Sequence, residues 1–302
     1  MSPLALLVAV WLSLAAALNI SHPHTVVERQ MKQFIFVDYN EAFPNMKIDV
    51  SCDDTKKKIL KTAWKESKLL AKAQTKHVKG YDYDLVHRTW LGEDWNRTLD
   101  FGLPNAIDIN NRTRSISKAF KRIKLLYAGV MKSNTEILWW CQDPDDRCEP
   151  DSRGLATIAE TWLDKKKGST DSKHHTVWCE EFLKRETLGE QVARYDQNKP
   201  EQHVIDNFEE NTAVTMFHET FHFPYLVSWP RIKDYTDDSD SAYQMAEVLG
   251  TTKAYRNAHS YAMDGLAIYI QQKFQLDSPP APRWVIEGTK PPAWKLIDQR
   301  VP

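Results

Sequence analysis

The 302-residue sequence predicts an α+β fold, predominantly helical with a small β-sheet. Apolar residues recur at helical spacing in several long segments, whereas two short stretches, 136–141 and 175–179, are rich in β-branched and aromatic residues. The chain is long enough to bury a substantial core, and no internal repeat is visible. We therefore expect one main domain over residues 52–276.

The first 17 residues have the features of a secretory signal peptide. Residues 4–18 are apolar and end in small residues, and the run is too short to span a bilayer comfortably. A buried N-terminal helix is the alternative, which the polar residues 19–24 disfavour. We assign 1–17 to the signal peptide and 18–51 to an irregular lead-in or short propeptide. No other segment is apolar enough to cross a membrane, so a secreted, extracellular protein is predicted.

The first predicted helix begins after Cys52. Asp53 and Asp54 place negative charge at its start, and apolar residues between positions 59 and 73 recur near helical spacing. A second helix is predicted across 116–131 from the same periodicity.

Two strands are predicted next, at 136–141 and 175–179, and each ends in a cysteine. Between them, residues 143–148 form a turn set by Pro144 and its acidic neighbours. A third helix carries residues 215–224, TMFHETFHFP, and a fourth covers about 254–274. Prolines end both helices, and we expect 277–302 to be a proline-rich tail on the surface.

Composition restricts the partners and the compartment. The 40 Lys and Arg residues face 41 Asp and Glu, so there is no excess basic charge to hold nucleic acid. Four cysteines suit two disulfides, and Asn96 and Asn111 begin N-glycosylation sequons. The cysteines lack the close spacing of a zinc site, because the nearest pair, Cys141 and Cys148, is seven apart.

The third predicted helix carries a His-Glu-x-x-His motif. His218 and His222 lie one turn apart on one face, so both imidazoles can reach one cation. Glu219 lies about 100° around the helix, where it can reach a metal-bound water as a general base without being a ligand. A pair of satisfied core histidines would fit the same apolar helix, so the third ligand decides between the two interpretations. Downstream, the acidic segment 234–240 offers Asp234 and Asp240, and a solvated acidic loop is the alternative for this segment.

These residues resemble the aspzincins, the deuterolysins and fungal lysine-specific metalloendopeptidases. The resemblance rests on His218-Glu-x-x-His222, Lys233-Asp-Tyr235, Ala242-Tyr243, Asn257-Ala-x-x-Tyr261, Thr89-Trp-Leu-Gly92 and the four cysteines, and covers residues 52–272. It implies a zincin-like metallopeptidase domain with Zn²⁺ held by His218, His222 and an aspartate.

The resemblance also implies further roles. Asp234 is favoured as the third ligand because a tyrosine follows it, whereas Asp240 keeps the family's three-residue spacing to Tyr243. Tyr243 would stabilise the oxyanion of the tetrahedral intermediate, with a packed core tyrosine as the alternative. The implied disulfides are Cys52–Cys141 and Cys148–Cys179.

One departure from the family concerns specificity. The lysine-specific members carry an acidic residue where this chain has His259, so a preference for lysine is not carried over. Asp264, about one helical turn further on, could substitute for it.

The sequence thus predicts a secreted, glycosylated, disulfide-bonded zinc endopeptidase, monomeric and acting on proteins or peptides, in which Glu219 activates the zinc-bound water. The alternative is a noncatalytic zinc-scavenging surface glycoprotein, since His222-Phe-Pro224 also resembles a group of fungal zinc-binding surface antigens.

Overall fold

The computed structural model describes residues 34–36, 46–96, 105–130, 135–150, 154, 156–165, 172–228 and 231–293. The chain divides into two units, Met1–Lys32 and Gln33–Pro302. The predicted signal peptide and the end of the predicted tail, residues 294–302, lie outside the described residues.

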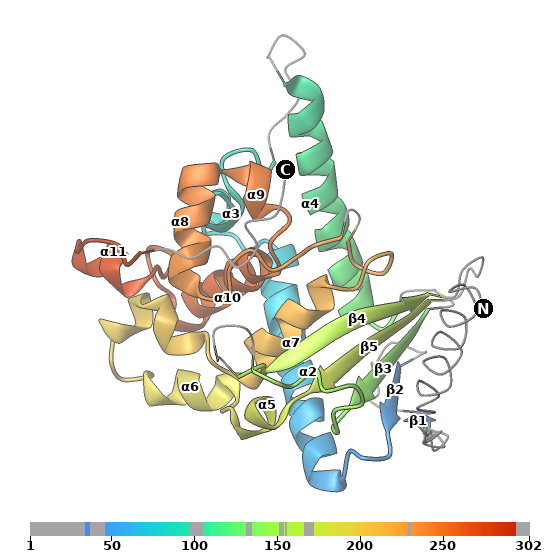
Figure 1. The fold of residues 1–302 in the computed structure, drawn as a ribbon. Coiled ribbons are helices and arrows are strands. Elements are labelled where there is room, and N and C mark those ends of the chain that lie inside the picture. Colours follow the sequence, from blue (N-terminus) through green and yellow to red (C-terminus); the bar gives the residue numbers. More distant parts are fainter. Residues whose placement is uncertain are drawn as a thin grey trace, which may run out of the picture. The chain divides into compact units, whose positions relative to one another are not determined.

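The fold is α+β, as predicted, and its sheet has five strands in the order β1-β2-β3-β5-β4 (Figure 1). The strands are β1 (Phe34–Phe36), β2 (Met46–Asp49), β3 (Glu136–Trp140), β4 (Ala159–Lys165) and β5 (Ser172–Trp178). β2, β3 and β5 run parallel, and β1 and β4 are antiparallel strands at the two edges. β3 and β5 are the two predicted strands. β1 and β2 fall within the segment expected to be irregular, and β4 was not predicted.

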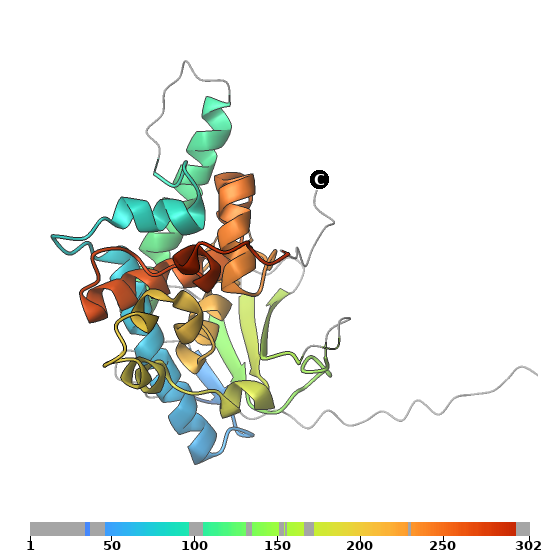
Figure 2. The same cartoon turned by 90° about the vertical axis from the view of Figure 1, so that its left-hand side faces the viewer.

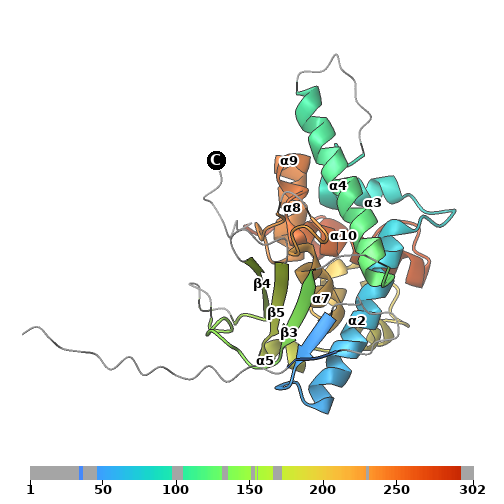
Figure 3. The same cartoon turned by 90° about the vertical axis from the view of Figure 1, so that its right-hand side faces the viewer.

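Three helices build the layers behind the sheet: α2 (Asp54–Thr75), α7 (Thr212–Phe221) and α10 (Ala258–Phe274). α7 lies between the sheet and α2 (Figure 3), and α10 packs against both helices. Trp139 and Trp178 point from the sheet into the same buried cluster as Phe217 and Phe221 of α7. The helix that carries the histidine motif is therefore the centre of the hydrophobic core.

The remaining helices surround this centre (Figures 1 and 2). They are α3 (Tyr83–Leu91), α4 (Ala106–Tyr127), α5 (Glu180–Lys184), α6 (Leu188–Arg194), α8 (Ser239–Leu249), α9 (Thr251–Ala254) and α11 (Arg283–Glu287), with 3₁₀ turns at Glu201–His203 and Ile205–Phe208. None of the helices in the described part of the chain combines the length and the apolar composition needed to span a membrane.

Two predicted boundaries differ from the structure, and so does the loop considered for the acidic segment. α4 begins ten residues earlier than expected, because its polar first turns lack the apolar periodicity that marked residues 116–131. The helix expected from 254 begins at Ala258, after the separate short helix α9. Part of the segment that could have been a solvated acidic loop is helix α8, and Asp238 caps it by accepting the Ser241 N–H.

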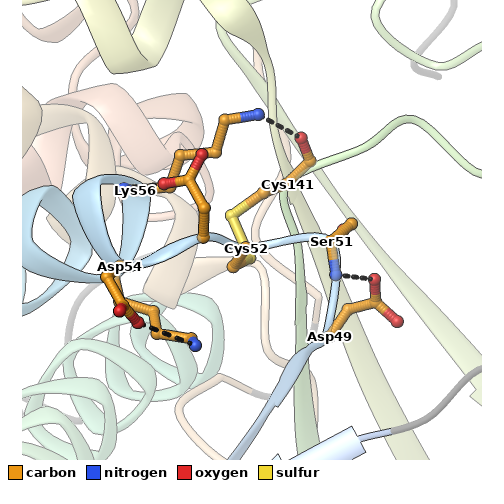
Figure 4. Close-up of a disulfide and its surroundings, with 8 residues drawn as sticks. Asp49, Ser51, Cys52, Asp54, Lys56 and Cys141 are labelled. Atoms are coloured by element: carbon orange, nitrogen blue, oxygen red, sulfur yellow. Dashed lines mark hydrogen bonds and ion pairs between the residues drawn. A yellow bond between two sulfur atoms is a disulfide. The ribbon is translucent and has the colours of Figure 1, made fainter.

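Two disulfides connect the sheet region to its surroundings, in the pairing that the resemblance implied. Cys52–Cys141 joins the start of α2 to the end of β3, and Cys148–Cys179 joins the loop after β3 to the end of β5. Figure 4 shows the first of them, where Lys56 Nζ also donates to the carbonyl oxygen of Cys141 at 3.4 Å.

Positive charge is concentrated on α2 and α4. Residues 54–130 contain 17 Lys and Arg against 8 Asp and Glu, although the whole chain has a net charge of -1. The exposed basic side chains of the two helices include Lys58, Lys61, Lys65, Lys72, Arg114, Lys118, Lys121 and Lys124. The rest of the chain is correspondingly acidic.

Candidate metal centre

The helix that presents the histidines is fixed at its N-terminus by a buried asparagine. Asn211 Oδ1 accepts the backbone N–H groups of Ala213 and Val214, both at 2.9 Å, and thereby caps α7. The ridge formed by Val214, Phe217 and Phe221 is buried, as the motif's surroundings predicted. One face of α7 is thus locked into the core, and the other is left to carry the polar side chains.

The structure brings the two histidines together with Asp234. His218 Nε2 and His222 Nε2 lie 3.1 Å apart. Asp234 Oδ1 lies 2.9 Å from each of these nitrogens. Three atoms from two separate segments of the chain therefore form one compact triangle.

The orientation of His222 is set by its other ring nitrogen. Nδ1 lies 3.2 Å from the carbonyl oxygen of Ile232, which can only accept, so Nδ1 carries the proton of the neutral ring. This leaves the lone pair on Nε2, which points at the triangle. The backbone contact had no signal in the sequence, because any residue supplies a carbonyl.

Glu219 lies beside this triangle. The ligand-capable atoms of His218, Glu219 and His222 all lie within 4.8 Å of one another. Glu219 is buried, and its Oε2 has no hydrogen-bond partner among the described residues. A buried carboxylate oxygen without a partner is costly, so its position calls for a ligand, a water or a proton.

The electrostatics of the group favour bound positive charge. Burial alone would lower the pKa of His222, but the charge and hydrogen bond of Asp234, followed by the charge of Glu219, raise it to about 9. Partial burial favours neutral Asp234, yet His222 and His218 outweigh it and hold the pKa of Asp234 well below its usual value. The same surroundings that stabilise a proton here would stabilise a metal cation in its place.

The donor set fits zinc. Two imidazoles and one carboxylate are the ligands of a common class of catalytic zinc sites, which keep a fourth position open. Ligand atoms about 2.1 Å from a tetrahedral ion stand about 3.4 Å apart, a few tenths of an ångström more than the 2.9–3.1 Å seen here. Small rotations of the three side chains would accommodate the ion.

The structure places the other two candidates in α8. Asp240 lies in its first turn, where burial and the charges of Asp206, Asp238 and Glu209 raise its pKa to about 6. The ring of Tyr243 packs edge-on against Trp90 and Trp284. Burial raises the pKa of Tyr243, so its hydroxyl stays protonated at neutral pH.

Two further residues bear on substrate preference. The His259 ring lies 5.8 Å from that of His218, centre to centre, and its Nε2 lies 3.9 Å from Glu209 Oε2. Asp264, which could have replaced the family's acidic residue, is fully buried and bonded to His87 at 2.7 Å and Gln74 at 2.8 Å. Its carboxylate is therefore part of the buried core and is not accessible to a substrate lysine.

Fold and site together define an α+β protein with a His-Glu-x-x-His helix in its core, whose two histidines lie against an aspartate from a separate segment. The profile of the family described as "HRXXH: Putative peptidase family" matches residues 3–273, so the chain belongs to this peptidase family. A search of curated proteins found no match. The family's name spells His-Arg-x-x-His, whereas residues 218–222 of this chain read His-Glu-x-x-His.

Proposed function

We propose that the protein is a secreted, zinc-dependent endopeptidase in which His218, His222 and Asp234 bind the metal and Glu219 is the general base. One observation carries the proposal: Asp234 Oδ1 lies 2.9 Å from both imidazole nitrogens, beside Glu219 Oε2, which has no hydrogen-bond partner in the part of the chain that the structure describes. The family supports a peptidase, and zinc, secretion and the role of Glu219 are our additions.

The proposed chemistry divides between the metal and Glu219. Zinc, when bound, supplies Lewis acidity. The Glu219 carboxylate takes a proton from the attacking water and passes it to the leaving amine. Because Glu219 is held in the core beside the histidines, it needs no rearrangement before the proton transfer.

The sheet supplies a binding surface for an extended peptide. Among the described residues β4 is an edge strand, which pairs with β5 and contacts α7. Backbone N–H and C=O groups on a free strand edge can pair with a peptide chain irrespective of its side chains. We propose that protein substrates bind along β4, which is consistent with an endopeptidase.

Secretion is supported by the two disulfides, which form and persist in oxidising compartments. Asn96 and Asn111 are both exposed, as glycosylation of their sequons requires. We therefore propose an extracellular glycoprotein.

Hydrolysis of an unfolded protein tests the proposal. We expect the mature chain to cleave it, a chelator to abolish cleavage, and added zinc to restore it. Glu219→Gln should lower kcat by at least about 100-fold while zinc remains bound. Glu181→Gln is the matched control, since Glu181 is exposed on α5 and bonded to Lys184. Cleavage that survives both the chelator and Glu219→Gln would refute the mechanism.

A noncatalytic zinc-binding glycoprotein is the second candidate. The arginine in the family's name favours it, because an arginine after the first histidine of such a motif could not act as a base. This candidate predicts stoichiometric zinc uptake dependent on His218 and His222, no cleavage, and indifference to Glu219→Gln. Glu219 itself is the feature that favours the peptidase.

A further inference from the structure

Asn257 lies at the N-cap of α10, but its side chain makes no hydrogen bond to that helix's backbone. An asparagine in this position ordinarily accepts an N–H from its own first turn. Here Oδ1 accepts instead from the backbone N–H groups of Tyr235, at 2.9 Å, and Thr236, at 3.2 Å. The side-chain oxygen that would ordinarily cap α10 therefore binds the segment that carries Asp234.

The amide nitrogen of Asn257 is also fully used. Nδ2 donates to Thr236 Oγ1 at 2.9 Å and to Ser260 Oγ at 3.0 Å. Asn257 is completely buried, so all four of its hydrogen-bonding positions are satisfied without water. Such a network fixes the geometry of its members closely, because each broken bond would leave a buried polar group unpaired.

The backbone continues this connection on the other side of Asp234. The Lys233 N–H donates to the Arg256 carbonyl at 2.7 Å, and the Ala258 N–H donates to the Lys233 carbonyl at 2.9 Å. Asp234 is therefore held from Lys233 before it and from Tyr235 and Thr236 after it. Ile232, which directly precedes Lys233, supplies the carbonyl oxygen that contacts His222 Nδ1.

From these contacts we infer that Asn257 is a positioning residue of the metal centre. By holding residues 233–236 against the start of α10, it places the Asp234 carboxylate against His218 and His222 and keeps the Ile232 carbonyl on His222. Asn257 is not one of the proposed metal ligands and acts through residues 233–236. This role rests on the metal-binding part of the proposed function and is independent of whether the protein cleaves peptides.

The test compares zinc affinity, measured by competition with a chelator of known affinity, with the thermal stability of the metal-free protein. Asn257→Ala removes all four side-chain bonds. We expect it to weaken zinc binding by about 10- to 100-fold, as losses of partners that orient ligands typically do. With Co²⁺ in place of zinc, we expect its visible spectrum to change because the Asp234 ligand is no longer fixed.

Gln202→Ala is the control. Gln202 is buried in the 3₁₀ turn Glu201–His203, a segment separate from α7 and from residues 232–236, and its Nε2 donates to the carbonyl oxygens of Tyr195 at 2.9 Å and Asp196 at 3.0 Å. Its loss should lower the Tm of the metal-free protein but leave zinc affinity within a few-fold of wild type. If Gln202→Ala weakens zinc binding as much as Asn257→Ala, Asn257 contributes only general stability and the inference is wrong.

Two milder variants cover the case in which Asn257→Ala does not fold. Asn257→Asp keeps the acceptor for Tyr235 and Thr236 and should bind zinc better than the alanine variant. Thr236→Val removes one partner of Nδ2 and should weaken zinc binding less than Asn257→Ala. Unchanged zinc affinity and an unchanged Co²⁺ spectrum in all Asn257 and Thr236 variants that fold would overturn the inference.

The outcomes also separate this inference from the proposed function. Zinc binding that depends on Asn257 without any peptide cleavage would refute the peptidase and retain the positioning role. Cleavage and zinc binding that are both unchanged in the Asn257 variants would retain the peptidase and refute the positioning role. A wild-type protein that binds no zinc would refute both.

Discussion

At the scale of single residues, the two aspartates of the acidic segment differ only through their surroundings. Asp234 lies opposite two imidazoles that favour its charged form, whereas Asp240 lies among Asp206, Asp238 and Glu209, which disfavour it. The sequence pattern favoured Asp234 without excluding Asp240, since each matches part of the family pattern. The choice depends on which one the folded segment turns toward α7.

Zinc titration of two matched variants tests this difference. We expect Asp234→Asn to weaken zinc binding by at least about 100-fold, because an amide replaces a charged ligand. Asp240→Asn should leave zinc affinity unchanged and raise stability slightly at neutral pH, since it removes like-charge repulsion at the start of α8. The opposite ranking of zinc affinities would assign the ligand to Asp240.

Tyr243 can be tested separately from the metal. Its protonated hydroxyl could donate to an oxyanion, while its ring contributes packing against Trp90 and Trp284. Tyr243→Phe keeps the ring, so we expect unchanged Tm and zinc affinity, with kcat lowered by about 100-fold if the hydroxyl acts on the oxyanion. A kcat equal to that of wild type would leave Tyr243 with packing alone.

At the scale of elements, sequence reasoning succeeded where a local pattern determines the structure. α2, α7 and strands β3 and β5 carry strong periodicity or β-branched and aromatic runs, and all four are present. α8 was not predicted because its acidic start suggested a loop, although Asp238 there caps the helix. The edge strand β4 was not predicted either, since its residues 159–165 alternate only weakly between apolar and polar.

The candidate site follows the same division. The His218, Glu219 and His222 arrangement is a property of one helix and could be read from spacing. The Asn257 contacts join residues more than 20 positions apart, and the Ile232 contact uses a backbone atom. No local pattern encodes either, so both required the folded structure.

β5 contains a buried histidine, His174, which we expect to make stability depend on pH. His174 is fully buried, and its ring lies 5.0 Å, centre to centre, from that of Phe223, the residue that follows His222. Burial first, and the neighbouring His175 second, lower the pKa of His174 to about 3. Between the unfolded value of about 6.5 and this value, the unfolded chain binds a proton that the folded protein does not.

Stability should therefore fall as the pH decreases below about 6.5. Between pH 7 and pH 5 we expect His174 to account for a loss of up to about 2 kcal/mol in the free energy of unfolding. His174→Leu should remove this part of the pH dependence, as measured by urea unfolding of the metal-free protein at both values. His203→Gln, at a less buried histidine outside the sheet, is the control. Equal pH dependence in wild type and His174→Leu would contradict the prediction.

At the scale of the whole molecule, the two disulfides close loops of different length. Cys52–Cys141 spans 89 residues and encloses α2, α3 and α4, whereas Cys148–Cys179 spans 31. A longer closed loop restricts the unfolded chain more, so the first should stabilise the fold by about 4–5 kcal/mol and the second by about 3–4 kcal/mol on the loop-entropy estimate.

Paired alanine variants measure these contributions. We expect Cys52→Ala with Cys141→Ala to lower the free energy of unfolding more than Cys148→Ala with Cys179→Ala, by about 1 kcal/mol, in denaturant titrations. Cys52, Cys141 and Cys179 are buried and Cys148 is half-buried, so the alanines remove largely buried sulfur from both sites. A larger loss for the shorter loop would show that contacts in the folded state outweigh the restriction of the unfolded chain.

Lysine and arginine are concentrated on α2 and α4, so this nearly neutral protein carries its charge unevenly. An anionic surface, such as a matrix of acidic polysaccharide, would attract residues 54–130 and repel the more acidic remainder. The protein would then adsorb in a preferred orientation despite a net charge of -1, and salt would release it at ionic strengths that screen charges over about 10 Å. The net charge therefore does not predict how this protein binds to charged surfaces. Its binding depends on whether the basic residues 54–130 or the acidic remainder faces the surface.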